Sequence, residues 1–384
     1  MRRAAPRPEP LISAVTRSAT RRGLLKCALA VGAAACLGRA GQAAAGVAQG
    51  PGLHSLAARK GLFFGCAIEG YRMAGDPDYG AIVARECGVA TPEGAMQWKS
   101  LQPEPGAFDF ERMDGARDWG RRHGFPLRGH AMLWHEGAPQ WFAQEFAAPA
   151  DWDRLVVPYA EAAGSRYARD LIHWDVLNEA LDPADGRADG LRDWALARAL
   201  GEDYVRLAFE LAGRAAPGVR LYYNDYGFEY GDRQGRRARA NLLAALERWL
   251  KAGVPIDGVG MQSHLETRRG LGDDAAGLRR FLADIAAFGL DIVISELDVR
   301  EHEFAAGRAR RDELVADEVR RYLDIALDEP AVRGVVTWGL SDRHSWLDWF
   351  HDERNRGLPY DAGLAAKPMR TAIAAAFEGA PDRL

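Results

Sequence analysis

The sequence predicts a single (β/α)8 barrel, and three observations favour that fold. Eight short apolar or β-branched runs recur along the chain, each of strand length. Amphipathic segments of helix length separate them, long enough to cross over between parallel strands. About 339 residues follow the first 45, which exceeds a usual single core but suits one large barrel.

The expected strands and helices alternate in order along the chain. The strands are expected at 62–69, 88–93, 126–134, 172–179, 219–225, 258–264, 291–296 and 334–338. The clearest helices between them are expected at 191–215, 236–252, 277–288 and 311–327. This alternation is typical of a parallel sheet with helices outside it.

Polar side chains gather where the expected strands end. In a parallel barrel the carboxyl ends of the strands form one face, and that face carries the active site. One carboxylate at a strand end can be purely structural, whereas a whole set of polar residues indicates a functional site. The set is Glu69, Glu93, His130, Asn178, Glu179, Asn224, Asp225, Gln262, His264, Glu296 and Trp338.

Two glutamates in this set, Glu179 and Glu296, stand at the ends of the fourth and seventh expected strands. Hydrolysis of an acetal with retention needs one carboxylic acid to protonate the leaving oxygen and one carboxylate to attack the anomeric carbon. The two carboxyl groups must lie about 5 to 5.5 Å apart. Like charges at that separation would raise the pKa of one partner, so we expect Glu179 to be protonated and Glu296 ionised.

Short motifs around these positions follow one another in a characteristic order. They read FGCAIE at 64–69, TPE at 91–93, GH at 129–130, WH at 134–135, WDVLNEA at 174–180, NDY at 224–226, GMQSH at 260–264, SELD at 295–298 and TWG at 337–339, followed by Asp342, SW at 345–346, PYD at 359–361 and KP at 367–368. Over about residues 62–377 the chain resembles glycoside hydrolase family 10, the (β/α)8 endo-β-1,4-xylanases.

The resemblance implies a retaining endo-xylanase with Glu179 as general acid/base and Glu296 as nucleophile, working through a covalent glycosyl-enzyme intermediate. It implies that Asn178 hydrogen-bonds the 2-hydroxyl of the sugar being cleaved. It also implies that His264 holds the Glu296 carboxylate. Asp298 and Asn224 are expected to support the site from behind the residues that touch sugar.

Further side chains are expected to bind the sugar chain, because pyranose rings present apolar C–H faces to aromatic planes while polar groups orient them. The expected binding residues are Glu93, Trp98, His130, Trp134, Asn178, Gln262, His264, Trp338 and Trp346. Trp349 and Phe350, in the long loop after the eighth strand, are expected near the substrate.

One motif departs from the family pattern. Where that pattern has Glu-Asn and, three residues later, Lys, this chain has Glu93, Gly94 and Gln97. Gly94 has no side chain to bond a sugar hydroxyl, and Gln97 is shorter and uncharged. We expect weaker binding of the second sugar on the non-reducing side. The alternative is that Lys99, two residues on, or another side chain brought in by a loop rearrangement substitutes for the lysine.

The first 45 residues predict a twin-arginine-type export signal. Arg21 and Arg22 precede an apolar, alanine-rich run at 24–37, and alanines at 43–45 suit cleavage. The run is shorter than the roughly 20 residues that span a bilayer. We expect a periplasmic or secreted protein with a short tether at 46–60 and a catalytic domain at 61–384. A retained anchor or a lipid on Cys36 is the alternative.

Charge and cysteine content restrict the partners. Eight of the 50 Lys and Arg and one of the 54 acids lie in residues 1–45, so the remainder has 42 basic and 53 acidic side chains, a net charge near −11. This charge argues against nucleic acid or an anionic membrane as partner. A neutral ligand is expected instead. The resemblance implies that this ligand is xylan or a xylo-oligosaccharide, bound by a monomer without metal or cofactor. Cys66 and Cys87 either pair or are simply buried.

Two other function classes remain open at this stage. A barrel β-1,4-glucanase uses the same Asn-Glu arrangement on the fourth strand, although Gln262, His264 and the TWG motif favour xylan. A non-catalytic glycan-binding protein is the second, and retention of both glutamates argues against it. A metallohydrolase is disfavoured because no His-x-His occurs on the first strand.

Overall fold

The computed structural model describes residues 50–270, 274–350 and 353–383, so the expected export signal lies outside the described residues. Within these ranges no helix is long and apolar enough to cross a membrane.

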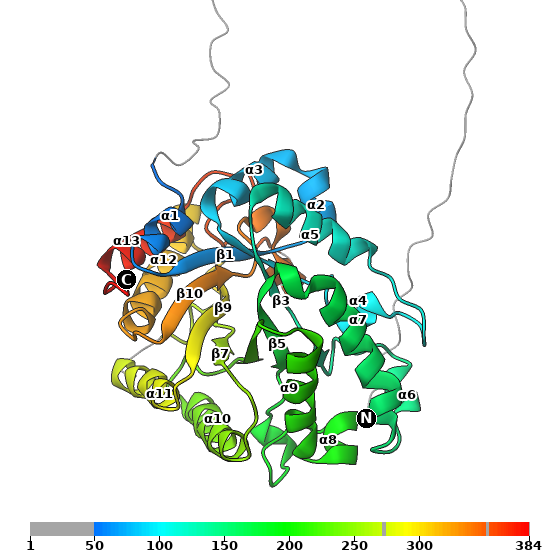
Figure 1. Cartoon of the computed structure of the whole chain (residues 1–384). Coiled ribbons are helices and arrows are strands. Elements are labelled where there is room, and N and C mark those ends of the chain that lie inside the picture. The colour runs from blue at the N-terminus through cyan, green and yellow to red at the C-terminus, as the bar shows by residue number, and fades with distance from the viewer. Residues whose placement is uncertain (1–49, 271–273, 351–352, 384) are drawn as a thin grey trace, which may run out of the picture. The chain divides into compact units, whose positions relative to one another are not determined.

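Eight parallel strands close into a barrel, and this confirms the predicted fold (Figure 1). Each strand pairs in parallel with the next, and β10 pairs with both β1 and β9, which closes the ring. The barrel strands are β1 (Phe63–Ile68), β2 (Val89–Pro92), β3 (Leu127–Gly129), β5 (Leu171–Asn178), β6 (Arg220–Asp225), β7 (Gly258–Met261), β9 (Asp291–Arg300) and β10 (Val332–Thr337).

Two expected strands are each interrupted near the carboxyl face. The run at 126–134 divides into β3 and β4 (Leu133–Trp134), which pairs with β5. The run at 258–264 divides into β7 and β8 (His264–Glu266), which pairs with β9. Ser263, between β7 and β8, has a φ of 63°, in the left-handed region, so the chain turns there and redirects the residues that follow.

Helices surround the strands in Figure 1, as the alternating pattern predicts. The expected helix at 191–215 is two helices, because Gly201 takes a positive φ of 57° between them. The α-helices are α1 (Leu53–Ala58), α2 (Gly70–Gly75), α3 (Pro77–Glu86), α4 (Trp98–Leu101), α5 (Glu111–His123), α6 (Phe142–Glu145), α7 (Val157–Tyr167), α8 (Ala195–Leu200), α9 (Asp203–Ala215), α10 (Arg233–Lys251), α11 (Ala275–Ala287), α12 (Arg308–Ala326) and α13 (Pro368–Gly379). Short helical turns add η1 (Trp152–Val156), η2 (Ala168–Asp170), η3 (Pro183–Asp185), η4 (Asp342–His344) and η5 (Trp346–Phe350).

A small apolar cluster joins strands from across the barrel. Tyr222, Val293 and Val336 are fully buried together, and Phe63 packs against them. His173 lies between two aromatic rings of this layer, 5.7 Å from Phe63 and 4.6 Å from Tyr222 between ring centroids. The barrel interior is therefore closed by side chains beneath the polar face that carries the site.

The prediction of a tether at 46–60 is wrong for residues 53–58, which form helix α1. Leu53 and Leu56 in α1 are buried, and this helix packs against α13 and β1. The Leu53 amide donates a 2.9 Å hydrogen bond to Glu86 Oε2. Residues 53–58 belong to the barrel domain because a short amphipathic helix gains more from burying its leucines than from staying in solvent.

Cys66 and Cys87 are free thiols, and both are buried. Of the two possibilities left open by the sequence, the structure has burial without a disulfide.

Glu86 contacts both the first helix, α1, and the last helix, α13, so we expect it to stabilise the fold. Its fully buried carboxylate accepts hydrogen bonds from the Leu53 amide and the Tyr360 hydroxyl, the latter at 2.6 Å, and pairs with Arg370 at 3.2 Å. Glu86→Ala should lower the free energy of unfolding by about 3–5 kcal/mol, because it leaves a buried cation without its anion. Urea denaturation followed by circular dichroism measures this loss.

The matched control is Glu247→Ala, which removes an exposed glutamate from α10 and should change stability by less than about 0.5 kcal/mol. Burial raises the pKa of Glu86, but the bonds from Tyr360 and Leu53 and the charge of Arg370 hold it below the ordinary value. Its stabilisation should therefore be present at neutral pH and be lost as the pH falls through that lowered pKa. Equal stability of Glu86→Ala and Glu247→Ala would contradict a stabilising role for Glu86.

Candidate active site

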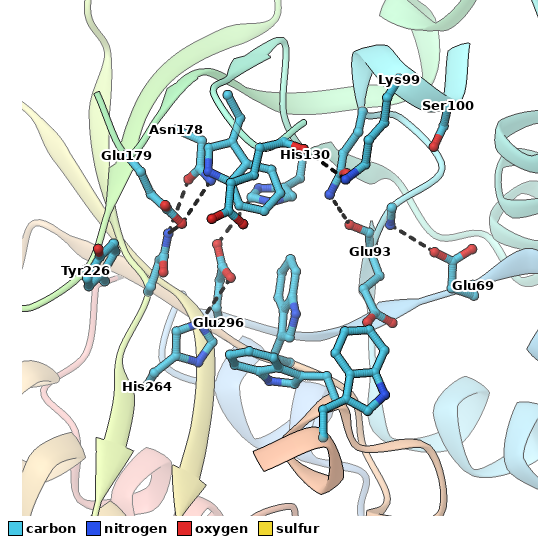
Figure 2. A pocket seen from close by; sticks show the side chains of 18 of the residues that line it. Glu69, Glu93, Lys99, Ser100, His130, Asn178, Glu179, Tyr226, His264 and Glu296 are labelled. Carbon is cyan, nitrogen blue, oxygen red and sulfur yellow. Dashed lines mark hydrogen bonds and ion pairs between the residues drawn. The ribbon is translucent and has the colours of Figure 1, made fainter. Parts of the chain in front are cut away.

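A cleft of about 750 Å³ lies at the carboxyl ends of the strands. Figure 2 shows Glu179 and Glu296 in its middle, with Tyr226 towards one end and Glu69 and Glu93 towards the other. Among the residues expected from the sequence to act on or bind sugar, the cleft brings together Glu93, His130, Trp134, Asn178, Glu179, Gln262, His264, Glu296, Trp338 and Trp346.

Glu296, on β9, is a buried carboxylate with two close donors and a third group, a ring nitrogen, farther away. Asn224 Nδ2 donates to its Oε1 at 2.7 Å, and His264 Nε2 lies 3.3 Å from its Oε2. His130 Nδ1 is 3.8 Å from Oε1. Burial alone would raise the pKa of Glu296, but the charge of His130 and the bonds from His264 and Asn224 hold it below the ordinary value. Glu296 is therefore ionised at neutral pH.

Glu179 follows β5 in a different environment. Its Oε1 accepts from Gln262 Nε2 at 3.1 Å and from Asn178 Nδ2 at 3.4 Å. Burial raises its pKa, the Gln262 bond opposes this, and the negative charge of Glu296 adds to the rise. The two carboxyl groups thus have pKa values displaced in opposite directions, which is how one becomes an acid and the other an anion.

The backbone at Glu179 is strained. Its φ of 55° lies in the left-handed region, which costs a non-glycine residue on the order of 1–3 kcal/mol. A 2.9 Å bond from the Glu179 amide to the Asn224 carbonyl holds this conformation. The turn points the carboxyl group into the cleft at the end of β5.

Amide side chains link the two glutamates into one network. Gln262 Nε2 also donates to Asn178 Oδ1 at 3.2 Å, and Asn224 Nδ2 donates to the same oxygen at 2.8 Å. Asn224 therefore contacts Asn178 and Glu296 at once. The position of each glutamate is set through shared partners and not by rotamer preference alone.

His264 is fixed on its second nitrogen. Its Nδ1 lies 2.8 Å from Asp298 Oδ1, and Trp346 Nε1 donates to Asp298 Oδ2 at 2.7 Å. Burial would lower the pKa of His264, but Asp298 and Glu296 raise it well above the ordinary value, so it is a cation beside the Glu296 carboxylate.

Three supporting residues were missed from the sequence. Arg128 and Asp175, both fully buried, form an ion pair beneath the site. Asp175 Oδ2 lies 2.9 Å from His130 Nδ1, and Arg128 Nη2 donates to Asn224 Oδ1 at 3.3 Å. Ser295 Oγ donates to the same Asn224 oxygen at 2.6 Å. The available signal was the two-residue period of strands, which puts Arg128 on the same face as His130.

Trp98 is a correction. Its side chain is 1% exposed and does not line the cleft. It stacks on Tyr159, with ring centroids 4.7 Å apart and planes at 12°, and its Nε1 donates to Gln102 Oε1 at 2.8 Å. The short helix α4 turns this indole inward, and its neighbour Lys99 lines the cleft instead. Trp349 and Phe350 do line the cleft, and Trp349 is 82% exposed.

The end of the cleft near Gly94 contains two ion pairs. Arg112 Nη2 lies 2.9 Å from Glu69 Oε1, and Arg72 Nη1 lies 2.8 Å from Glu93 Oε2. The Gly94 amide donates to Glu69 Oε1 at 2.9 Å. Gln97 is almost buried, with its amide nitrogen 3.3 Å from the Glu93 carbonyl oxygen.

Lys99 does not replace the missing lysine directly. Its Nζ donates to the Glu136 carbonyl at 2.9 Å and lies 5.8 Å from the centre of the Trp134 ring. Within the described ranges no group of three or more His, Cys, Asp or Glu side chains is arranged to hold a metal ion.

The chain matches the family described as "Glycosyl hydrolase family 10" over residues 52–376. It is 31% identical to "Endo-1,4-beta-xylanase A" of Fusarium oxysporum f. sp. lycopersici, over 74% of this chain and 86% of that protein. It is 32% identical to "Endo-1,4-beta-xylanase 1" of Humicola insolens, over 84% of this chain and 73% of that protein. The crystal structure of xylanase 10B from Thermotoga petrophila RKU-1 in complex with xylobiose superposes with a TM-score of 0.77 at 26% identity, covering 87% of this chain and 99% of that one.

Gly260 on β7 leaves the space that Asn224 occupies, which generates a prediction. A Cβ at position 260 would stand 2.0 Å from Asn224 Oδ1. Gly260→Ala should displace the Asn224 amide from Glu296 and lower kcat/KM on xylan, the substrate in the relatives' names, by about ten- to a hundred-fold. The assay is run where circular dichroism shows the variant to be folded.

The control is Gly213→Ala on α9, where a Cβ would lie 3.7 Å from Leu221, an ordinary contact. That variant should keep its activity and be equally or slightly more stable. Full activity of Gly260→Ala would show that the position of Asn224 does not govern turnover.

Proposed function

Because the chain belongs to glycosyl hydrolase family 10, we propose that it hydrolyses internal β-1,4 bonds of xylan with retention of the anomeric configuration. The observation that carries this proposal is the pair Glu179 and Glu296 in one cleft, with pKa values displaced upward and downward by their surroundings. The names of the curated relatives supply the substrate.

In the first step the protonated Glu179 gives its proton to the glycosidic oxygen while the Glu296 carboxylate attacks the anomeric carbon. The carbon–oxygen bond to the leaving sugar breaks and a glycosyl ester on Glu296 forms. The His264 cation and the Asn224 amide hold Glu296 for this attack. Asn178 is hydrogen-bonded to Glu179 and to Asn224, and the proposal has it bond the 2-hydroxyl of the sugar.

In the second step Glu179, now ionised, takes a proton from water, and the water oxygen attacks the anomeric carbon. Glu296 leaves as a carboxylate and Glu179 is again protonated. The rise in the pKa of Glu179 caused by the anion of Glu296 disappears while the ester is present, so Glu179 becomes a base when one is needed.

Aromatic side chains along the cleft suit the faces of the sugars. Trp338 is mostly buried with its ring centroid 5.0 Å from that of His130, and Trp346 is held edge-on to His264. The cleft thus offers stacking planes beside the catalytic pair. Xylan degradation outside the cytoplasm is the proposed setting, supported by the twin-arginine pattern in the sequence.

The nucleophile assignment predicts a chemical rescue. Glu296→Ala should lower turnover of xylan by several orders of magnitude. Added azide should restore cleavage of an activated aryl xylobioside and yield the α-glycosyl azide, because a small anion fills the vacated space. Nuclear magnetic resonance of the product gives its configuration. The control Glu111→Ala, an exposed glutamate on α5, should stay near wild type. Residual activity above about a tenth of wild type in Glu296→Ala would contradict the role.

The acid role of Glu179 predicts a dependence on the leaving group. Glu179→Ala should collapse activity on xylan but spare the glycosylation step on a dinitrophenyl xylobioside, so a burst of dinitrophenol appears. In the wild type kcat/KM should fall as the pH rises through the raised pKa of Glu179 and as it falls through the lowered pKa of Glu296. In Glu179→Ala the fall of kcat/KM at high pH should disappear. An equal loss in the rate of the glycosylation step on xylan and on the dinitrophenyl xylobioside would show that Glu179 is not the general acid.

The site for the second sugar on the non-reducing side is predicted to bind weakly because of Gly94 and Gln97. The double substitution Gly94→Asn with Gln97→Lys should raise kcat/KM for an aryl xylobioside by about ten-fold or more, and much less for the aryl xyloside, since only the longer substrate reaches these contacts. A Cβ at position 94 would lie 3.1 Å from Glu69 Oε1, so Gln97→Lys alone is the control without crowding. Equal changes for both substrates would contradict the prediction.

A further inference from the structure

A second cavity of about 430 Å³ opens beside the catalytic cleft. Loops that follow β5 and β6 and the first turns of α10 form its walls. Tyr226 lines both the cleft and this cavity, so the two spaces adjoin at its side chain. The volume lies in the range of pockets that hold a small organic group.

Three arginines line this cavity, and only one is matched by a carboxylate. Arg192 Nη1 pairs with Asp182 at 3.0 Å. Arg237 donates to the Pro183 carbonyl, which is neutral. Arg233 is exposed and, over the ranges described, its side chain makes no ion pair or hydrogen bond.

The other lining carboxyl group is Asp225, which does not offset these charges at neutral pH. It is 3% exposed, and burial raises its pKa to about 8. Among the lining side chains two positive charges are therefore in excess. Residues 46–384 carry a net charge near −11, so the cavity is a local exception that attracts anions.

The cavity also has an aromatic wall. The Tyr226 side chain is 42% exposed at the boundary between the two spaces, and Phe228 lines the cavity. Guanidinium groups bind carboxylates with directed, charge-assisted hydrogen bonds, and an aromatic plane accepts the C–H face of a sugar ring. The combination suits a sugar that carries a carboxylate better than a bare inorganic anion.

The cavity adjoins the end of the cleft opposite Gly94, which the proposed function makes the leaving-group side. Arg192 Nε donates to the backbone carbonyl of Glu179 at 2.8 Å, next to the proposed acid. The end of the cleft that contains Gly94 is opposite, as Figure 2 shows by the positions of Tyr226 and Glu93. We propose that the cavity lined by Arg192, Arg233, Arg237 and Tyr226 binds the carboxylate of a uronic acid branch on the xylan chain, on the leaving-group side.

This inference rests on the proposed function and is tested with three substrates of one backbone length. The first is an unbranched xylo-oligosaccharide. The second carries a single glucuronic acid branch, and the third is the same branched molecule with the carboxyl group reduced to an alcohol. The mature wild type should cleave the acidic substrate with a kcat/KM about five- to twenty-fold above that of its reduced counterpart, the range that a partly exposed charged contact allows.

In the variant Arg233→Ala with Arg237→Ala the kcat/KM of the acidic substrate should fall to that of the reduced substrate. Arg192 is left unchanged because it contacts Glu179. The matched control is Arg236→Ala with Lys251→Ala, which removes the same two positive charges from exposed sites on α10 that do not line the cavity. It should retain the preference. Raising the salt concentration should shrink the wild-type ratio, since the contact is partly exposed.

The outcomes separate the two proposals. Failure of the wild type to cleave any of the three substrates would overturn the proposed function. Cleavage of all three with equal kcat/KM for the acidic and reduced substrates would overturn the cavity assignment alone. Loss of the preference in the Arg236→Ala, Lys251→Ala control to the same extent as in Arg233→Ala with Arg237→Ala would likewise overturn it, because the effect would then come from general charge and not from this cavity.

Discussion

The buried, ionised carboxylate of Glu296 is the constraint around which the site is built. An anion that is 4% exposed costs several kcal/mol in desolvation unless charges and donors surround it. The His264 cation, the Asn224 amide and the nearby His130 provide that surrounding. Removing their support would shift the pKa of Glu296 upward and favour the neutral acid, which is incompatible with the proposed role of nucleophile.

Each of these groups is held in turn by further residues, and of these only Trp346 lines the cleft. Asp298 and Trp346 orient His264, while Ser295 and Arg128 fix the Asn224 oxygen so that its nitrogen faces Glu296. A flipped Asn224 would put an oxygen against a carboxylate. The polar interior of the barrel thus sets the direction of one amide, and that direction serves both glutamates.

The barrel makes this arrangement possible because parallel strands deliver side chains from distant segments to one face. β5, β6, β7 and β9 bring Asn178, Asn224, Gln262 and Glu296 within hydrogen-bonding reach, although their residues span more than a hundred positions. Loops after the same strands then add what is particular to this chain. Those after β5 and β6 form the arginine-lined cavity, and the loop after β10 brings Trp346 and Trp349 to the cleft.

The sequence alone determined the repeated strand and helix pattern and the polar residues at strand ends, because hydrophobic period and strand position are local properties of the chain. It therefore predicted the barrel and placed Glu179 and Glu296 on its active face. The tertiary structure decided which neighbours bury which groups. It turned Trp98 inward against Tyr159, packed α1 onto the domain, placed Arg128 and Asp175 beneath His130, and put Arg233 on the wall of the second cavity. Those outcomes depend on contacts between segments far apart in the chain, and no local pattern encodes them.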